Sequence, residues 1–285
     1  MKIIQYVRFF LFKAFPISII KLEFYRNAKY WPDLRNPQTL NEKLTWLKLN
    51  WRDDLAKQCA DKSMVRKYVA DQGLSDILLK SYGIFHHPDD IDFSLLPDEC
   101  MIKVSHGCGQ NLHYIKGESN VLVIKKKLNK WLKESHYVDS LEWIYETKRP
   151  SILIEEFIKT DHLAPPNDYK IFCFNGKPAF LFVASDRGKN TTKFDFFDLQ
   201  WNHLQVRNHY PNSNQIIKKP EKFKEMLEYA SILSKPFPQV RIDFYYEKGK
   251  IYFGEMTFFH FSGNQPFEPG EWDLILGKDL FLSIE

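Results

Sequence analysis

The clearest structural signal in the sequence is Val240-Arg-Ile-Asp-Phe-Tyr-Tyr-Glu-Lys-Gly-Lys-Ile-Tyr-Phe-Gly-Glu-Met-Thr-Phe-Phe259. Two runs of aromatic and β-branched residues flank a glycine-containing turn, which predicts a β-hairpin. In the first strand, alternation places Arg241 and Asp243 on one face. Glu255 and Thr257 likewise share one face of the second strand. The hairpin therefore carries four polar side chains on a ribbon that is otherwise largely apolar.

The length of the turn decides whether the two acidic side chains meet. A two-residue loop at Lys248 and Gly249 would place Asp243 and Glu255 on opposite faces. A three-residue loop over 247–249 would bring both acids, the arginine and the threonine onto one face. We expect the three-residue loop, because Gly249 stands where that loop needs a left-handed residue.

The four polar side chains allow two interpretations. An arginine, two carboxylates and a hydroxyl are costly to bury without partners. Mg²⁺ carrying phosphates would be such a partner, because this ion takes one or two carboxylates together with phosphate oxygens. A salt bridge between Arg241 and Asp243 on a solvated sheet face would give the same pattern. The hairpin by itself leaves the metal site and the salt bridge as open alternatives.

Composition and charge exclude several classes of protein. The chain has 285 residues, enough for one large domain or two modest domains. Aromatic residues make up 16% of the sequence, which excludes global disorder. A net charge of only +4 gives no reason to expect nucleic acid as a partner. The four cysteines form no Cys-x-x-Cys pair and no secretory cleavage site is seen, so we expect a cytoplasmic location.

The first 29 residues are basic and amphipathic. Their apolar runs are interrupted by Arg8, Lys13 and Pro16, so none approaches the roughly 20 residues of a membrane span. Such a segment can lie on an anionic surface, which would place the protein peripherally at the inner membrane face. It can also pack on the domain with its lysines in water, and both alternatives stay open.

A glycine-containing loop follows a short strand in the first half of the chain. Residues 101–105 alternate as a strand that carries Lys103, and His106-Gly-Cys-Gly-Gln-Asn111 follows. The loop matches neither the Walker A motif nor the dinucleotide fingerprint, in which Leu112 would have to be a glycine. Its amides could fold over phosphates, with Lys103 at the base. An ordinary glycine turn would look the same.

Three further segments carry candidate residues. A helix is expected over 53–71, and it contains Lys62. An almost continuously apolar strand over 152–158 is interrupted by two glutamates. An Asn-Gly turn predicts a hairpin over 168–183, in which Lys170 lies among apolar neighbours.

Two polar loops and a terminal helix have weaker signals. The triplet Asp90-Ile-Asp92 could hold the metal of a glycosyltransferase, but helix capping or solvation explains so short a pattern more simply. The basic loop 186–193 suits an anionic substrate or a mobile lid, and a plain surface loop has the same composition. A short helix is expected over 272–281.

The order of these motifs resembles the ATP-grasp superfamily. The nearer resemblance is to the teichuronopeptide-biosynthesis-like (TupA-like) ATP-grasp amidoligases of bacterial surface-polysaccharide loci, from about residue 30 to the C-terminus. It rests on the phrases Asn36-Pro-Gln-Thr-Leu-Asn-Glu-Lys-Leu-Thr-Trp-Leu-Lys48, Asp168-Tyr-Lys-Ile-Phe-Cys-Phe-Asn-Gly-Lys-Pro178, Asp198-Leu-Gln-Trp201 and Phe237-Pro-Gln-Val-Arg-Ile-Asp-Phe-Tyr245.

The resemblance implies an α+β, ATP-grasp fold in which two α+β subdomains enclose a nucleotide cleft. Residues 1–60 would be a helical N-terminal extension. Residues 61–152 would form the first subdomain with the glycine-rich loop. Residues 153–285 would form the second, with the hinge, the metal-binding hairpin and the C-terminal helix.

The resemblance also implies roles for individual residues. Lys62 and Lys103 would contact the phosphates of ATP, and Asp168 would bind the ribose. The remaining nucleotide-binding residues would be the loop His106, Gly107, Cys108 and Gly109 and the hinge Glu155, Glu156, Phe157 and Ile158. The Mg²⁺ ligands would be Asp243 and Glu255, with Thr257 in the place of the usual asparagine. The catalytic cations would be Arg241, Lys170 and Arg187, and Lys170 would also contact the nucleotide.

The activity implied by the resemblance is ATP-dependent ligation of a carboxylate to an amine through an acyl phosphate, with ATP and Mg²⁺ as cofactors. The partners would be an amino acid or other amine and a uronic-acid carboxylate of a capsular or other surface polysaccharide, or of its nucleotide- or lipid-linked precursor. Two other classes stay open. One is a polysaccharide-biosynthesis glycosyltransferase or an ATP-grasp-type sugar kinase, and the other is a non-catalytic nucleotide- or glycan-binding protein.

Overall fold

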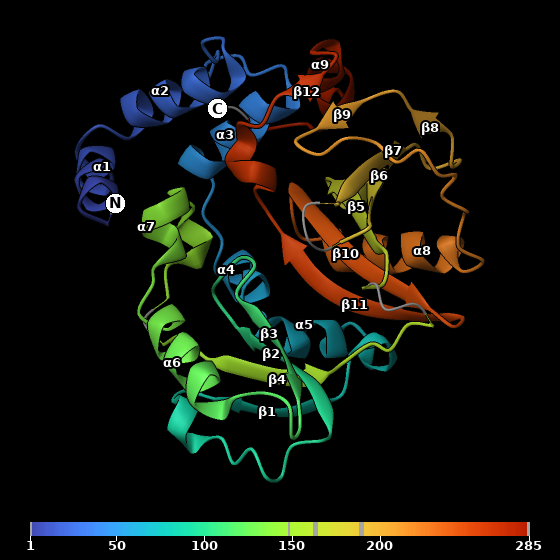
Figure 1. Ribbon diagram of the computed structural model, residues 1–285. Helices are drawn as coiled ribbons and strands as arrows, with labels where there is room; N and C mark the ends of the chain where they lie inside the picture. Colours follow the sequence, from blue (N-terminus) through green and yellow to red (C-terminus); the bar gives the residue numbers. More distant parts are fainter. Residues whose placement is uncertain (1, 148, 162–164, 188–190, 284–285) are drawn as a thin grey trace. The chain divides into compact units, whose positions relative to one another are not determined.

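A computed structural model of the protein describes residues 2–147, 149–161, 165–187 and 191–283. The chain divides into two compact units, whose elements are labelled in Figure 1. Asp54–Lys159 form the central unit, and Met1–Asp53 together with Thr160–Glu285 form the terminal unit. The subdomain limits after residues 60 and 152 stay predictions, whereas the limits of the compact units follow Asp53 and Lys159.

The central unit contains an antiparallel sheet in the order β1-β4-β2-β3. Its strands are β1 (Ser81–Phe85), β2 (Glu99–Val104), β3 (Asn111–Ile115) and β4 (Ile152–Glu156). Its helices are α4 (Asp54–Ala60), α5 (Val65–Asp71), α6 (Val121–Trp131) and α7 (His136–Ser140). Ile102 and Ile154 of the sheet and Ile124 and Leu128 of α6 share one hydrophobic core.

The terminal unit contains a larger antiparallel sheet in the order β11-β10-β5-β6-β7-β8, and a short ladder of β12 with β9. The strands are β5 (Asp168–Phe174), β6 (Lys177–Ser185), β7 (Lys193–Phe197), β8 (His203–Leu204), β9 (Arg207–Asn208), β10 (Gln239–Glu247), β11 (Lys250–Thr257) and β12 (Phe267–Glu268). The helices are α1 (Lys2–Ala14), α2 (Pro16–Ala28), α3 (Leu40–Asn50), α8 (Phe223–Ser234) and α9 (Glu271–Gly277).

Helix α8 packs against β5, β6 and β10 of the large sheet. Its side chains at Met226, Ala230 and Leu233 are buried, as the helical spacing of apolar residues requires. On the strands, Phe172 and Phe182 are fully buried. The apolar run of β5 is therefore a core strand, which explains why its few charged residues have to be paired with other charges.

The turn between β10 and β11 differs from the prediction. The two strands pair as far as Glu247 and Lys250, so the loop consists of Lys248 and Gly249. Both loop residues have positive φ, the conformation of a tight two-residue hairpin turn. The expected three-residue loop is wrong, because the twist of the strands is matched by two successive left-handed residues.

A β-bulge in β11 nevertheless brings the acidic side chains together. Asp243 pairs with Glu255, but Phe244 pairs with Phe253, so Gly254 is an extra residue. The extra residue reverses the alternation beyond it, and the two acids share a face. A Cβ on Gly254 would lie 3.0 Å from the backbone oxygen of Asp243. The face predicted from the sequence is observed, although the bulge and not the turn creates it.

Several other expected elements have different limits. The helix expected over 53–71 is divided into α4 and α5, because Asp61 Oδ1 accepts hydrogen bonds from the amides of Ser63 (2.9 Å) and Met64 (3.1 Å). Lys62 therefore lies in a turn. The strand expected over 152–158 ends at Glu156, and the C-terminal helix ends at Gly277. The Asn-Gly hairpin is present as β5 and β6.

Candidate active site

Strands β10, β11 and β5 hold a buried network around Asp243. Arg241 donates to this carboxylate twice, from Nε to Oδ1 and from Nη2 to Oδ2, both at 2.7 Å. Lys170 on β5 also donates to Oδ2. The Nη2 of Arg241 donates to Thr257 Oγ1 at 3.0 Å and lies 3.7 Å from Glu255 Oε1. The bulge thus places the four polar residues of the hairpin on one face, and the pairing of β10 with β5 sets Lys170 opposite Asp243.

Two more charged residues extend this network. Asp168 Oδ2 lies 2.7 Å from Lys170 Nζ and accepts a hydrogen bond from Arg187 at 2.6 Å. Asp168 Oδ1 is buried and has no hydrogen-bond partner among the described residues. Burial alone would lower the pKa of Lys170, but the carboxylates of Asp168 and Asp243 outweigh it and raise that pKa, so the amine stays protonated. We call the seven residues the hairpin cluster: Arg241, Asp243, Glu255, Thr257, Lys170, Asp168 and Arg187.

A buried histidine orients Arg241. The guanidinium Nη1 lies 2.8 Å from His260 Nδ1, and His260 Nε2 lies 2.9 Å from Asn208 Oδ1. Arginine can only donate, so Nδ1 accepts and Nε2 carries the hydrogen that it donates to Asn208. Burial, and then the positive charges of Arg241 and Lys170, lower the pKa of His260 well below its usual value. His260 is therefore a neutral positioning residue, and it has no nitrogen left for proton transfer.

The donor set of the hairpin cluster fits a Mg²⁺ ion that also binds phosphate. Asp243 and Glu255 lie side by side, and three of the roughly four lone-pair sites of the Asp243 carboxylate are used by Arg241 and Lys170. The unpartnered Oδ1 of Asp168 would be available as a further oxygen ligand. Among the described residues no three acidic, histidine or cysteine side chains could hold a metal ion by themselves. A metal here would thus need phosphate oxygens, as Mg²⁺ commonly does.

The central unit holds a second charged group, around Glu155 on β4. Lys103 of β2 donates to Glu155 Oε1, and Arg66 of α5 lies 3.8 Å from Glu155 Oε2. Arg66 is held in place by donating to the backbone oxygen of Leu79 at 2.6 Å. The sheet register pairs Met101 with Glu155, so Lys103 and Glu155 emerge on the same face of neighbouring strands. Among the described residues, two cations therefore contact this one carboxylate.

The glycine loop between β2 and β3 is tied to Lys62. The ammonium of Lys62 donates to the backbone oxygen of Gly107 at 2.6 Å. Gly109 has a φ of +68°, which few other residues adopt. Cys108 is exposed, whereas His106 is buried and its Nε2 bonds to the backbone oxygen of Glu134 at 2.9 Å. The structure thus brings Lys62 to the loop, although they are far apart in the sequence.

The predicted hinge residues have different surroundings. Glu155 is buried, but Glu156 is exposed and its amide donates to the backbone oxygen of Lys80 at 2.9 Å. Phe157 stacks on His113, with the ring centroids 4.0 Å apart. Ile158 follows the end of β4 and is partly buried. Contact with adenine by these four residues stays a prediction.

The acidic triplet at 90–92 forms a local turn. Asp92 Oδ1 accepts from the amide and the hydroxyl of Ser94, at 2.9 and 2.6 Å. This is the bonding pattern of a capped turn, which is the simpler of the two interpretations. Of the loop 186–193, residues 188–190 lie outside the described residues.

Comparison with known proteins identifies the family. The profile of the family described as TupA-like ATPgrasp matches residues 42–281, which is most of the chain. The chain belongs to this family. The recognition and the α+β ATP-grasp fold class predicted from the sequence are thereby confirmed. A comparison with curated proteins gives no match.

Solved structures similar to this TupA-like ATP-grasp chain are distant. D-alanine–D-alanine ligase from Bacillus anthracis complexed with ATP is 15% identical, with 78% of this chain and 66% of that chain covered and a TM-score of 0.46. N5-carboxyaminoimidazole ribonucleotide synthetase from Thermus thermophilus is 11% identical, with 70% of this chain and 45% of that chain covered and a TM-score of 0.40. The ATP-grasp ligase PsnB complexed with minimal precursor, Mg and ADP is 12% identical, with 76% of this chain and 57% of that chain covered and a TM-score of 0.39. The chain thus spans 45–66% of the lengths of these proteins.

Sequence reasoning missed residues that support the candidate site from outside its motifs. His260 and Asn208 orient Arg241, and Arg66 shares Glu155 with Lys103. His260 lies just after β11, so its place in the sequence next to the acidic hairpin is a signal that could have identified it. Asn208 and Arg66 gave none, because only tertiary packing brings them to their partners.

Proposed function

We propose that this TupA-like ATP-grasp protein is an ATP-dependent ligase that joins a carboxylate to an amine. One observation carries the proposal: the hairpin cluster gathers three cations and three carboxylates, most of them buried, with an acid pair formed across a bulge. So many buried charges cost stability unless a ligand uses them. A phosphate chain with its Mg²⁺ brings both signs of charge at once, and this cluster can receive both.

The residues of each unit have separate parts in this proposal. Asp243 and Glu255 hold Mg²⁺, which neutralises phosphate charge when it is bound. Arg241, fixed by His260, and Lys170 donate to phosphoryl oxygens. In the central unit, Lys62 and Lys103 bind phosphates.

The proposed chemistry relies on positioning and charge neutralisation. A substrate carboxylate oxygen attacks the γ-phosphorus of ATP, ADP leaves, and an amine then displaces phosphate from the acyl phosphate to form an amide. The hairpin cluster supplies donors for the charge that develops on the oxygens. Its residues include no nucleophile paired with a base, and the adjacent His260 has both ring nitrogens in hydrogen bonds. The protein therefore acts as an electrostatic template.

We propose an amino acid as the amine and a uronic acid of a surface polysaccharide, or of its precursor, as the carboxylate. This choice follows from the resemblance of the sequence motifs to enzymes of surface-polysaccharide loci. A glycosyltransferase, a sugar kinase and a non-catalytic binder are the alternatives that an assay has to separate.

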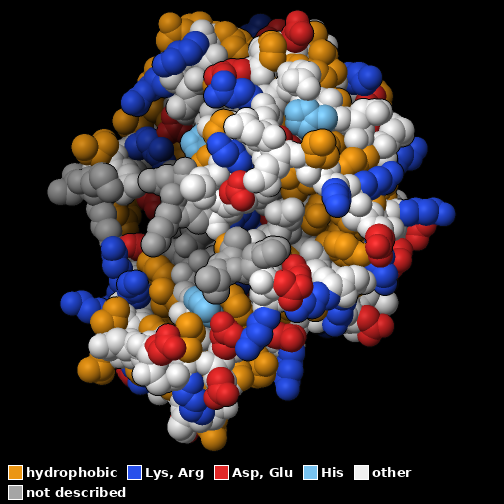
Figure 2. Space-filling view, turned by 45° about the vertical axis from the view of Figure 1, so that its right-hand side comes forward, with side chains coloured by type: hydrophobic (Ala, Val, Ile, Leu, Met, Phe, Trp, Pro, Cys, Tyr) orange, Lys and Arg blue, Asp and Glu red, His pale blue; other side chains and the backbone are white. Residues whose placement is uncertain are grey.

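On the face shown in Figure 2, lysine and arginine side chains are interspersed with acidic ones, which does not favour nucleic acid as the partner.

We further propose that α1 and α2 contact an anionic membrane surface. The side chains of Ile4, Phe10 and Phe15 are each more than 60% exposed, although apolar side chains are normally buried. Lys13 and Lys21 lie on the same two helices and suit anionic lipid. No helix among the described residues is long and apolar enough to cross a membrane. Sedimentation with phosphatidylglycerol vesicles, but not with phosphatidylcholine vesicles, is the expected result, and Phe10→Asp should abolish it.

The decisive experiment for the ligase measures ADP release with amino acids and uronic-acid glycosides together and separately. We expect release only when both are present, with a product mass equal to their sum less water. Asp243→Asn and Glu255→Gln should each remove this turnover. Asp195→Asn is the matched control, because Asp195 is a buried acid of β7 that bonds to Ser213 and His203 outside the hairpin cluster. A product that has gained a sugar or a phosphate instead would refute the ligase.

A further inference from the structure

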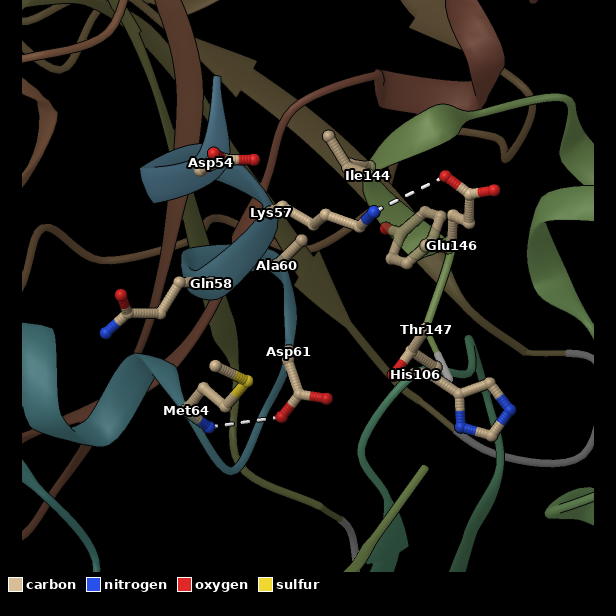
Figure 3. A pocket seen from close by; sticks show the side chains of 11 residues that line it. Asp54, Lys57, Gln58, Ala60, Asp61, Met64, His106, Ile144, Glu146 and Thr147 are labelled. Atoms are coloured by element: carbon tan, nitrogen blue, oxygen red, sulfur yellow. Dashed lines mark hydrogen bonds and ion pairs between the residues drawn. The ribbon is translucent and has the colours of Figure 1, made fainter. Parts of the chain in front are cut away.

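A pocket of about 600 Å³ lies within the central unit (Figure 3). One wall comes from α4 and the turn that follows it, including Asp61, and the opposite wall from residues 144–147. His106 of the glycine loop also lines it. This volume is in the range of roughly 300–1,000 Å³ typical of small-molecule sites. The function proposed above uses none of this space.

The lining of the pocket favours a cation. Asp54, Asp61 and Glu146 contribute carboxylates, against one lysine, Lys57. Lys57 Nζ lies 3.4 Å from Glu146 Oε2, so these two charges offset each other and the aspartates remain. Since no group of three potential metal ligands occurs in the described part of the chain, a metal ion is a poor occupant. An organic cation meets the same charge requirement without close coordination.

His106 supplies an unused acceptor in the same wall. It is only 4% exposed, and its Nε2 lies 2.9 Å from the backbone oxygen of Glu134. A carbonyl can only accept, so Nε2 carries the hydrogen, and the neutral ring has its lone pair on Nδ1. This Nδ1 is buried without a hydrogen-bond partner among the described residues. A buried polar atom of this kind is costly unless a ligand donates to it.

The charges around His106 keep its ring neutral. Burial lowers its pKa most, and Lys62 acts in the same direction. The Glu134 backbone bond and the charges of Asp61 and Glu134 oppose this effect without overcoming it. Nearby His136 has a pKa lowered to about 4 and is also neutral. At neutral pH the ring therefore offers an acceptor and adds no positive charge to the pocket.

One carboxylate oxygen of Asp61 is available to a ligand. Its Oδ1 accepts hydrogen bonds from the amide and the hydroxyl of Ser63 and from the amide of Met64. Figure 3 shows the bond from Met64 as a dashed line. These bonds fix the carboxylate and leave Oδ2 for a ligand. The same turn carries Lys62, which bonds to Gly107 next to His106. The pocket and the proposed phosphate-binding loop are thus built from the same two segments.

We propose that this pocket binds the primary ammonium group of the amine substrate, with Asp61 Oδ2 and His106 Nδ1 as its acceptors. The inference rests on the proposed ligase function and assigns one of its two substrates to a site. The ammonium donates one hydrogen to each acceptor, and its third faces the open volume of the pocket. The rest of the pocket holds the body of the amine.

The test is direct titration of the full-length protein, with and without ADP. The probe is L-alaninamide, which carries the ammonium, and the matched control ligand is N-acetyl-L-alaninamide, which lacks it. We expect the wild type to bind the first and not the second. Asp61→Asn should weaken binding about ten-fold or more, because a charge-assisted hydrogen bond is lost. Asparagine caps turns as well as aspartate, so this variant keeps the local fold.

Three further variants make the test specific. Asp76→Asn removes an exposed carboxylate of the central unit outside the pocket and should leave affinity unchanged. His106→Asn keeps an acceptor near the position of Nδ1, whereas His106→Gln keeps a donor near Nε2 and loses that acceptor. Binding should therefore survive better in His106→Asn than in His106→Gln, and thermal unfolding of each variant checks that it is folded.

The outcomes separate this site from the proposed function. Equal binding of the acetylated control, no binding to the wild type, or unchanged affinity in Asp61→Asn would each overturn the amine site. If amine-dependent ADP release is then still observed, the ligase proposal stands and its amine binds elsewhere. If alaninamide binds as expected but no amine gives ADP release, the site stands and the ligase proposal falls.

Discussion

The two units contain buried charge of different kinds. In the terminal unit the hairpin cluster has as many cations as carboxylates, and Arg241, Lys170 and Asp243 are nearly inaccessible to solvent. In the central unit two cations, Lys103 and Arg66, share the single carboxylate of Glu155. Lys62 lies beside the glycine loop, where the carboxylates of Asp61 and Glu134 also act on His106, so it adds no net positive charge there. The charges of the hairpin cluster are thus balanced, whereas around Glu155 two cations of the described residues contact one carboxylate.

This difference indicates what each group is prepared to bind. An excess of cations attracts phosphate oxygens directly, and it is tolerable because the side chains of Lys103 and Arg66 are partly exposed. A balanced, buried group gains little from an anion or a cation alone, since either would upset its neutrality. It is suited to a metal ion and phosphate arriving together.

Removing one carboxylate from each group should have unequal consequences. Asp243→Asn leaves Arg241 and Lys170 buried with too little negative charge, and should lower the free energy of unfolding by about 3–5 kcal/mol. Glu155→Gln leaves partly exposed cations and should cost only about 1–3 kcal/mol. Urea unfolding of both variants measures the two values. Equal losses would show that the burial of the hairpin cluster has no special energetic weight.

Removing a cation from the central unit should affect ATP more than stability. In Lys103→Met, Arg66 still faces Glu155, so the free energy of unfolding should change by less than about 1.5 kcal/mol. Loss of one charged donor to phosphate should lower kcat/KM for ATP about 10- to 100-fold. ADP release at varied ATP measures this effect. Lys67→Met is the control, because Lys67 lies on the same α5 as Arg66 but pairs with Asp71 at the surface. An unchanged kcat/KM in Lys103→Met would remove Lys103 from the nucleotide site.

The same contrast explains how much could be predicted from the sequence. The hairpins were predictable, because strand alternation and the Asn-Gly turn are local signals. The shared face of Asp243 and Glu255 was also predicted, but for a wrong reason. The turn length was judged from Gly249, whereas the alternation is reversed at Gly254. A glycine within a strand is a known sign of a bulge, so Gly254 is the local signal for this reversal.

What could not be predicted depends on contacts between distant residues. The bonds of Arg241 to His260 and of His260 to Asn208 join three separate segments. No periodicity encodes such a chain of bonds. The same holds for Lys62, which a continuous helix would have pointed into water. Its position near Gly107 arises because Asp61 breaks that helix at a single turn.

Two glycines of the hairpin test the role of the bulge. Gly254→Ala places a Cβ 3.0 Å from the backbone oxygen of Asp243 and should lower the free energy of unfolding by about 1–3 kcal/mol. Because the acids are then displaced, ADP release should need a higher Mg²⁺ concentration. Gly249→Ala meets no neighbour within 4 Å, and its φ of +74° costs about 1–2 kcal/mol. Its Mg²⁺ dependence should stay that of the wild type. If Gly249→Ala shifted the Mg²⁺ dependence instead, the turn and not the bulge would place the acids.

The smallest effect concerns the neutral histidine that holds Arg241. Because the pKa of His260 is lowered in the folded state, the unfolded chain binds the proton first as the pH falls below about 6.5. The free energy of unfolding should therefore decrease towards acid, by at most about 1.4 kcal/mol per pH unit from this residue. In His260→Gln this contribution is absent, so the stability difference between wild type and variant should shrink by about 1 kcal/mol between about pH 7.5 and 5.5. Groups common to both proteins, such as Asp273 with its pKa raised to about 6, cancel in this difference.

Urea unfolding at about pH 7.5, 6.5 and 5.5 measures this difference for the two proteins. A neutral His260 is required if it accepts from Arg241, because a protonated ring would place a third positive charge beside Arg241 and Lys170. A constant difference across this pH range would mean that the folded protein takes up the proton as readily as the unfolded chain. Arg241 would then lack a fixed acceptor on that side. The balance of charge in the hairpin cluster would have to include the imidazolium, and the cluster would resemble the cation-rich group of the central unit.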